Sequence, residues 1–527
     1  MILSVPTTWE EDYLLRLKDY PEVGWLYGSL PTEIVGSGRQ AALLPAINRA
    51  SAAEHIRQAQ RLGFKFNYLV NTSCLGNREY TRDFHRAMLR YIEWVAEQNP
   101  DMITVTLPFI AQIIKKRFPA LKISVSKYAN VDSLEKAKFW EDLGADEITI
   151  PDDSLNRDFK MLRLMRETLR CGMQVFANLA CLRGCPFAHH HANLASHGSQ
   201  RHEEAGGVYL EYCLANCKNI RVRRPVEIIK SGWIRPEDLH HYEELGISKF
   251  KLVDRSLTSR GLLKRVKAYS ERKYIGNLAD IICLHTKRRE HRFAAANLEA
   301  KEAGLKEKLR LMGDAIFAAE KIYLDNQMLD GFLSGIKKID CRYLSCDRCG
   351  YCDRYAQKAI SFSPEDREEA IRRSDLFLQK MTSSEIFDSP PPASSCHGST
   401  TTDLVPNRTR KREKVRQLMK LKGYSGGVEQ RLKSLGPLLP YLETKEGIKT
   451  PLSMGSEIKP EEVMERMMDL YEQYWGEEEI DEMLVFFQNP VGEKLLASSK
   501  GLAYKLLTVV DDYIMEKMQE TKKSKLH

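Results

Sequence analysis

The first half of the chain alternates short apolar segments with longer amphipathic ones. Apolar, β-branched runs of five to eight residues recur between residues 20 and 275, and segments of 10 to 17 residues with helical spacing separate them. This alternation is typical of βαβ units, whose strands form a parallel sheet. The expected strands are residues 23–30, 66–71, 102–107, 121–126, 147–151, 173–178 and 249–253, and the expected helices are residues 51–62, 81–97, 131–143, 156–170 and 236–245.

Two helix–strand junctions repeat the same pattern. Residues 143–150 read Leu-Gly-Ala-Asp-Glu-Ile-Thr-Ile, and residues 245–252 read Leu-Gly-Ile-Ser-Lys-Phe-Lys-Leu. In each, a glycine ends a helix and a short buried strand follows. Seven or eight such units within about 250 residues predict an α/β fold with a (β/α)8 barrel. A doubly wound sheet is disfavoured, because no Gly-x-Gly-x-x-Gly segment opens a helix, and the segment from Gly36 to Arg39 is too short a signal for phosphate binding.

The remainder of the chain is predicted to be mostly α-helical. We expect a barrel domain over residues 1–275 with a cysteine-rich insert, a helical region over 276–387 and a small all-α domain over 413–527. Residues 388–412 are rich in Ser, Pro, Thr and basic residues, which indicates a flexible linker.

Composition limits the class of protein. Of 527 residues, 43% are hydrophobic and 29% charged, which is typical of a globular chain with a sizeable core. No apolar run approaches the roughly 18 residues of a membrane span, and the N-terminus lacks the basic start of a secretory signal. We therefore expect a cytoplasmic protein without a membrane span. The net charge of +8 permits RNA or another anionic substrate, but it also suits an ordinary solvated surface.

Cysteines carry the strongest chemical signal. Eight of the twelve fall into two groups of four, and in a reducing compartment such clustering indicates metal ligation rather than disulfides. The first group consists of two CxxxC pairs, Cys181 with Cys185 and Cys213 with Cys217. Zinc sites more often use CxxC pairs, so the wider spacing favours a 4Fe–4S cluster over zinc or unligated thiols.

The second group comprises Cys341, Cys346, Cys349 and Cys352. Its CxxCxxC run resembles that of bacterial ferredoxins, in which the chain wraps a cubane, and zinc is the alternative here. If both groups hold clusters, electrons could pass between them. Cys171 and Cys283 are expected to be buried, unligated thiols.

The first group follows the sixth expected strand. Barrel enzymes carry their chemistry at the carboxyl ends of the strands, where Asn71, Asn178 and the pair Asp254 and Arg255 also fall. The triplet from His189 to His191 is interpreted as a polar loop, because three consecutive residues cannot all face one ion.

Residues 20 to 275 resemble peptidase family U32. Arg183-Gly-Cys185 and the run from Cys213 to Lys218 match the cysteine pattern of the family, and the strand that ends in Asp254-Arg255 resembles its strand ending in Glu-Gly-Arg. Two departures are the closely spaced first cysteine pair and the shifted carboxylate.

The resemblance implies an activity. Some members of the family are iron–sulfur proteins that hydroxylate a base in RNA or a quinone precursor without oxygen gas, taking the oxygen from prephenate. By this resemblance Asp254 and Arg255 would face the substrate, and Arg255 could anchor an anion. Cys74 would be a reserve ligand, and an electron donor protein would be a partner.

Two other functions remain open. The chain could be a metal-stabilised binding or scaffold protein whose C-terminal helical domain recruits a protein partner; residues 475–494 resemble a small bacterial helical domain of unknown function. It could also be a peptidase, as the family name suggests, although no His-Glu-x-x-His motif is present.

Overall fold

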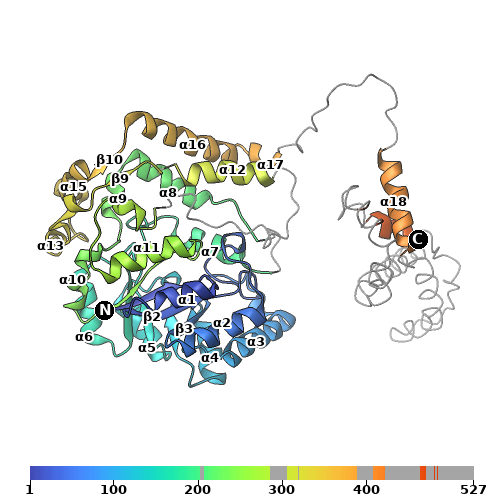
Figure 1. Cartoon of the computed structure of the whole chain (residues 1–527), viewed down its shortest axis with the longest axis horizontal. Coiled ribbons are helices and arrows are strands. Elements are labelled where there is room, and N and C mark those ends of the chain that lie inside the picture. Colours follow the sequence, from blue (N-terminus) through green and yellow to red (C-terminus); the bar gives the residue numbers. More distant parts are fainter. Residues whose placement is uncertain are drawn as a thin grey trace, which may run out of the picture. The chain divides into compact units, whose positions relative to one another are not determined.

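Eight parallel strands form a closed barrel in the computed structural model (Figure 1). Neighbouring strands pair in chain order, and β1 pairs with β8 to close the sheet. The structure describes residues 1–201, 207–284, 305–318, 320–388, 407–421 and 463–469, together with residues 480 and 484. The predicted (β/α)8 barrel is confirmed. Its strands are β1 (Ile2–Pro6), β2 (Val23–Gly28), β3 (Lys65–Val70), β4 (Met102–Val105), β5 (Ile123–Val125), β6 (Glu147–Thr149), β7 (Gly172–Phe176) and β8 (Lys249–Lys251).

One strand was missed by the sequence-based prediction. β1 is a five-residue segment, Ile-Leu-Ser-Val-Pro, and it pairs with both β2 and β8. A short apolar run that ends in proline, with no helix before it, carries little periodic signal. The seven predicted strands are therefore β2 to β8. The sequence had suggested that the first cysteine group follows the sixth strand. With β1 counted, the group follows the seventh strand of the barrel.

Burial on both faces explains why such short segments form strands. Every residue of β4, β5, β6 and β8 is buried, because one face fills the barrel and the other contacts helices. The two glycine junctions are also as predicted. Gly144 and Gly246 adopt positive φ angles of 95° and 77°, which glycine tolerates without strain, and β6 and β8 follow.

Helices between the strands surround the barrel (Figure 1). The side chains of Asn48, Ser133, Asp158 and Thr258 accept backbone N–H groups at the starts of four of them. The predicted helix over 236–245 is a 3-10 turn followed by a short α-helix. The helices are α1 (Glu11–Leu17), α2 (Arg49–Arg61), α3 (Arg82–Glu97), α4 (Pro108–Arg117), α5 (Leu134–Asp142), α6 (Phe159–Thr168), α7 (Ala188–His197), α8 (Tyr212–Arg223), α9 (Val226–Lys230), α10 (His240–Glu243) and α11 (Ser259–Ser270).

The helices after the barrel pack against α8. Helices α12 (Leu305–Ile316) and α16 (Pro364–Thr382) contact each other and α8, and they share a buried apolar cluster with Leu214 and Cys217. Residues Met1–Ser394 form one compact unit, so the described part of region 276–387 belongs to the same unit as the barrel. Its other elements are β9 (Tyr323–Leu324), α13 (Phe332–Ile336), α14 (Cys346–Cys349), α15 (Tyr351–Ala359), β10 (Ile360–Ser361) and α17 (Glu385–Asp388).

The second compact unit spans Ser395–His527. Within it, helix α18 (Asn407–Leu421) begins inside the segment predicted as a linker. Arg412 of α18 forms ion pairs with Glu465 and Asp469, at 2.5 and 2.7 Å, which joins α18 to the described segment 463–469. Most of the predicted linker and most of the predicted all-α domain lie outside the described residues.

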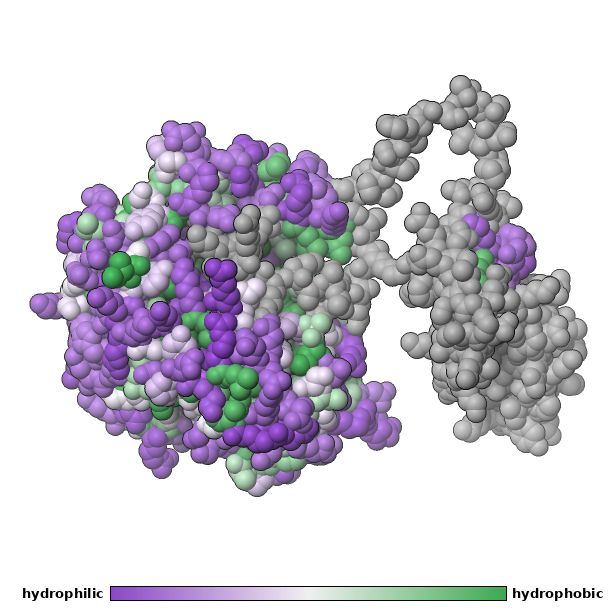
Figure 2. All heavy atoms as spheres, in the orientation of Figure 1, coloured by the Kyte–Doolittle hydropathy of each residue, from purple (hydrophilic) through white to green (hydrophobic). Residues whose placement is uncertain are grey.

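The described surface is mainly polar. On the face shown in Figure 2, hydrophilic residues dominate and apolar ones are scattered. Tyr343, which lies between Cys341 and Cys346, is the most exposed of the large apolar residues described, at 87%. Within the described ranges, no helix is both long and apolar enough to cross a bilayer.

Candidate functional site

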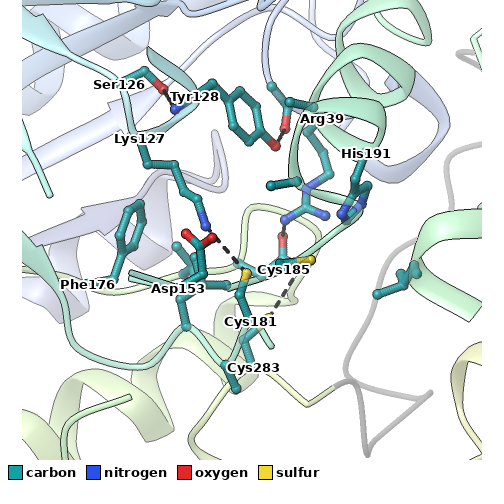
Figure 3. Close-up of a pocket in the computed structure, with 18 of the residues that line it drawn as sticks. Arg39, Ser126, Lys127, Tyr128, Asp153, Phe176, Cys181, Cys185, His191 and Cys283 are labelled. Atoms are coloured by element: carbon teal, nitrogen blue, oxygen red, sulfur yellow. Dashed lines mark hydrogen bonds and ion pairs between the residues drawn. The ribbon is translucent and has the colours of Figure 1, made fainter. Parts of the chain in front are cut away.

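A cavity of about 180 Å³ lies at the carboxyl ends of the strands, and all four cysteines of the first group line it (Figure 3). Its walls come from the segments that follow the barrel strands and from helices α7 and α8. Segments 181–185 and 213–217 therefore meet at one place. This is the end of a parallel barrel where catalytic residues are found.

Helix α8 positions two of the four thiols. Cys213 and Cys217 are four residues apart, so they lie on one face of the helix, and both are buried. One turn further on, Arg221 donates a hydrogen bond to Cys217 Sγ at 3.6 Å and another to the carbonyl of Ala180. Arg221 thus ties the thiol-bearing face of α8 to the segment that leads into Cys181.

The loop after β7 positions the other two thiols. Gly184, between Cys181 and Cys185, adopts a positive φ of 58°, and its N–H donates to the carbonyl of Asp153 at 2.9 Å. Lys127, which follows β5, donates from Nζ to Cys181 Sγ at 3.4 Å (Figure 3). An ammonium group beside a sulfur favours its thiolate form.

Burial opposes ionisation of these thiols. It places the pKa of Cys181 well above the ordinary value, raises that of Cys185, and raises the pKa of Cys213 to about 12. Although burial also disfavours a charged amine, the Asp152 carboxylate raises the pKa of Lys127 above its usual range. Cysteines bind metals as thiolates. Metal binding here would therefore require the metal cations to compensate the negative charge of the sulfurs.

The spacing of the sulfurs distinguishes two kinds of centre. In a tetrahedral zinc site each sulfur lies ~2.3 Å from the ion, so the sulfurs are within about 4 Å of one another. In the part of the chain that the structure describes, no three cysteine sulfurs lie within 4.8 Å of one another. A cubane binds each thiolate through a different iron and tolerates wider spacing.

Asp254 and Arg255, which were predicted to face a substrate, both line the cavity. Asp254 is fully buried, and its Oδ1 lies 2.9 Å from Nη2 of Arg39. Arg255 donates instead to the hydroxyl groups of Ser29, at 2.7 Å, and Ser37, at 3.2 Å. Burial, together with the nearby Arg39, lowers the pKa of Arg255 to about 10. The catalytic role of the two residues stays a prediction, but their place on the cavity wall suits it.

Only some of the other residues predicted at strand ends line the cavity. Asn71 lines the cavity. Asn178 is buried and braces the backbone of Val253, accepting from its N–H at 2.7 Å and donating to its carbonyl at 2.6 Å. Cys74 is not among the described residues that line the cavity, and its Sγ accepts the N–H of Gly76 at 3.3 Å. The role of Cys74 as a reserve ligand stays a prediction.

The histidine triplet lies on helix α7, which corrects the expectation of a polar loop. His189 and His191 line the cavity, whereas His190, about 100° further round the helix, is not part of its described lining. His191 Nε2 lies 3.3 Å from Oε2 of the buried Glu211. Although burial opposes its ionisation, this contact lowers the pKa of Glu211.

Several side chains of the cavity were not identified from the sequence, among them Arg39, Lys127, Lys251 and Cys283. Cys283 was expected to be an isolated buried thiol, yet its Sγ lies 3.9 Å from Asp254 Oδ2. Lys251 is only 7% exposed, and burial lowers its pKa to about 7. The sequence signals that could have identified these residues are an arginine next to a glycine and a lysine at the end of a strand. Both are common outside functional sites.

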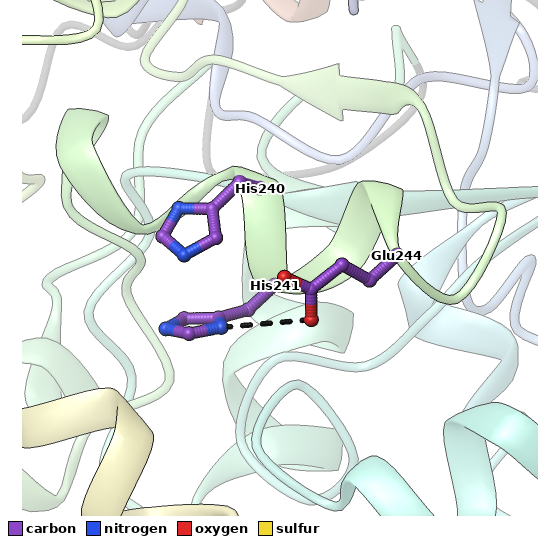
Figure 4. Close-up of side chains that lie close together, drawn as sticks. All are labelled: His240, His241 and Glu244. Carbon is purple, nitrogen blue, oxygen red and sulfur yellow. Dashed lines mark ion pairs between the residues drawn. The ribbon is translucent and has the colours of Figure 1, made fainter.

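A further set of metal-type ligands lies at α10. Ligand atoms of His240, His241 and Glu244 all lie within 4.8 Å of one another (Figure 4). Lys337 already supplies a positive charge to this set, because its Nζ lies 3.3 Å from His241 Nδ1 and 3.1 Å from Glu244 Oε2. We therefore assign no metal to it.

The second cysteine group is also brought together. Cys341 follows α13, Cys346 and Cys349 are the first and last residues of α14, and Cys352 lies in the first turn of α15. All four are partly exposed. Burial is the main cause that raises the pKa of Cys341, and Cys346 and Cys349 lie close enough to add to it.

Comparisons with known proteins give consistent results. A family model described as peptidase family U32 matches residues 44–181, and one described as an uncharacterized protein conserved in bacteria (DUF2059) matches residues 461–520. An uncharacterized protease of Methanocaldococcus jannaschii is 30% identical over 332 residues, 62% of this chain and 86% of that protein. The tRNA hydroxylation protein P of Escherichia coli is 26% identical over 95 residues, 18% of this chain and 20% of that protein. A solved U32 peptidase shares 20% identity at a TM-score of 0.36, covering 48% of this chain and 93% of that one.

The fold and the cavity define a parallel barrel whose mouth is lined by cysteines. The match over most of the length of the Methanocaldococcus jannaschii protein shows that the chain belongs to peptidase family U32, as its motifs predicted.

Proposed function

We propose that this protein is an iron–sulfur enzyme of the U32 family that hydroxylates a planar aromatic substrate without oxygen gas. The substrate is either a base in RNA or a small quinone-like ring. One observation carries the proposal: both CxxxC pairs converge on one cavity at the catalytic end of the barrel. Cys181, Cys185, Cys213 and Cys217 would hold a 4Fe–4S cluster there. The Escherichia coli relative is a tRNA hydroxylation protein, which supports the reaction class.

The charge of the cavity suits this assignment. Six lysine and arginine side chains line it, against two aspartates. A thiolate-bound cluster is anionic, and this cationic wall would offset its charge. Lys127 and Arg221 donate hydrogen bonds to Cys181 and Cys217, so two of the positive charges lie next to the sulfurs.

In the proposed reaction the oxygen comes from an organic donor. In the balanced reaction, substrate R–H and donor D–OH give R–OH and D–H, so the donor gains the two electrons that the substrate loses. When bound, the cluster would supply one-electron chemistry. Arg255, which donates to the hydroxyl groups of Ser29 and Ser37, would bind a carboxylate of such a donor at the cavity wall. Lys251, whose pKa burial lowers to about 7, is suited to accept or return a proton near neutral pH.

A cytoplasmic location belongs to the same proposal. The eleven cysteines within the described residues are all free, which is consistent with a reducing compartment.

The function is tested in cells grown without oxygen. Hydroxylated nucleosides in RNA and small aromatic metabolites are compared between wild type and a deletion strain. We expect one hydroxylated product to disappear, and the kind of product distinguishes the RNA substrate from the small-molecule one. Identical profiles in the two strains would contradict the proposal.

Complementation assigns the activity to the cavity. Genes that encode wild type or Cys171→Ser should restore the product, because Cys171 lies outside both cysteine groups. The double variant Cys213→Ser/Cys217→Ser and the single variant Asp254→Asn should not restore it. Restoration by the double variant would show that the thiols are not required.

A further inference from the structure

The second cysteine group is built on a tight local turn. Cys346, Cys349 and Cys352 are three residues apart, and Gly350, at a positive φ of 59°, reverses the chain between α14 and α15. Cys341 and Cys352 both line a pocket of about 70 Å³ that is distinct from the barrel cavity. The four thiols thus come from one stretch of chain, as in a ferredoxin-type loop.

Cationic side chains outnumber acidic ones in the pocket. Arg157 lines it, and its Nη atoms donate to the carbonyl groups of Ile229 and Trp233, the latter at 2.8 Å. Its Nε is buried and has no hydrogen-bond partner among the described residues. The two aspartates of the pocket, Asp158 and Asp340, are already paired with Arg342 and Lys160.

The Arg157 guanidinium stacks on the rings of Trp233 and Phe332, at 4.6 and 5.0 Å from their centroids. It shares the pocket with two thiols of the group, Cys341 and Cys352. As neutral thiols they supply no charge, whereas four thiolates around iron carry a net negative charge. An anionic centre held by the four cysteines would therefore lie beside Arg157, whereas the neighbouring Lys230 already pairs with Glu227 at 3.3 Å.

We propose that Cys341, Cys346, Cys349 and Cys352 hold a second iron–sulfur cluster, through which electrons reach the barrel cavity. Zinc is the alternative occupant of the same four thiols, and metal analysis distinguishes the two. The electron-transfer part rests on the proposed function of the first group, whereas the cluster itself does not.

A direct contact joins the two groups. Arg183 lies in the loop between Cys181 and Cys185, and its Nη2 donates to the carbonyl of Cys341 at 2.6 Å. The loop that bears two ligands of the first group therefore touches the chain that bears the second. All four members of the second group are partly exposed, whereas two of the four in the first group, Cys213 and Cys217, are buried, so the proposed route has electrons enter at the second group.

The electron balance defines the role of this route. The proposed hydroxylation is redox-neutral, so it consumes no electrons from outside. A low-potential one-electron carrier protein would lose one electron to the second cluster, which would return to its oxidised state by passing that electron to the first. The route would thus set the oxidation state of the first centre before turnover begins.

Metal analysis of the full-length chain tests the cluster. Protein is purified without oxygen, and iron, acid-labile sulfide and zinc are measured in wild type, Cys349→Ser/Cys352→Ser, Cys213→Ser/Cys217→Ser and the control Cys171→Ser. We expect about eight iron and eight sulfide in wild type and in the control, and about half in each double variant. One zinc per chain that is lost only from Cys349→Ser/Cys352→Ser would overturn the proposal. So would an iron content that this variant leaves unchanged.

Arg183 tests the route without removing a ligand. In Arg183→Met, iron and sulfide should match wild type, while reduction of the first cluster by a one-electron carrier, followed by stopped-flow absorbance, should slow several-fold. Arg342→Met, which changes a neighbouring cation of the pocket, is the matched control and should not slow it. Equal rates in Arg183→Met and wild type would exclude this contact from the route. If iron is lost only from Cys213→Ser/Cys217→Ser, the cluster proposed for the first group stands and the cluster proposed for the second group is refuted.

Discussion

Arg39 Nη2 lies 2.9 Å from Asp254 Oδ1, and this ion pair joins the segment after β2 to the segment after β8 across the barrel mouth. Asp254 is fully buried, so the pair sits where water cannot compensate a lost partner. Removing one member of a buried pair leaves a desolvated charge and typically costs ~3–5 kcal/mol.

Arg39→Met should therefore destabilise the chain by about 3 kcal/mol, measured as the free energy of unfolding in urea. The double variant Arg39→Met/Asp254→Asn should recover much of that loss, because it removes the orphaned charge as well. If the double variant is no more stable than Arg39→Met, the two residues are not coupled as the structure indicates.

Lys251 should make stability depend on pH. Burial lowers its folded-state pKa to about 7, below the ~10.4 of an unfolded lysine. The unfolded chain therefore binds this proton more tightly, and the cost of burying Lys251 grows as pH falls from about 10 to 7 and is constant below 7.

Lys251→Met removes this cost. Its stabilising effect relative to wild type should be larger at pH 7 than at pH 9 by about 2 kcal/mol, as determined from urea unfolding at the two pH values. Lys267→Met, on an exposed position of α11, serves as the control and should show little difference. A pH-independent effect of Lys251→Met would mean that the amine is charged throughout this range.

Lys127 should tune the cluster proposed for the first cysteine group. Its ammonium donates to Cys181 Sγ at 3.4 Å, and a cation at that position stabilises the more negative, reduced state. Lys127→Met should lower the reduction potential of that cluster by on the order of tens of millivolts, measured by anaerobic dye-coupled titration, while Lys127→Arg should preserve most of it. An unchanged potential in Lys127→Met would place the cluster away from this side chain.

The barrel could be predicted because its signals are local. Gly144 and Gly246 each mark the end of a helix before a buried strand, and the same pattern recurs along residues 20 to 275. β1 could not be identified, because its five residues make sense only once β2 and β8 flank them.

Only part of the candidate site could be predicted from local sequence signals. Closely spaced pairs such as Cys213 and Cys217 are visible in one sequence because both ligands lie on one face of one helix. Arg39 and Cys283 reach the cavity through tertiary contacts with Asp254, and nothing near either residue signals that partner. The role of Arg183 is likewise visible only from its contact with Cys341 in a distant segment.

Iron and sulfide analysis of anaerobically purified protein tests the central claim most directly. Replacing Cys213 and Cys217 by serine should remove about four iron and four sulfide per chain, together with the corresponding part of the absorbance near ~400 nm that dithionite bleaches. A colourless wild-type protein that contains stoichiometric zinc, or an iron content that the double variant leaves unchanged, would contradict the account.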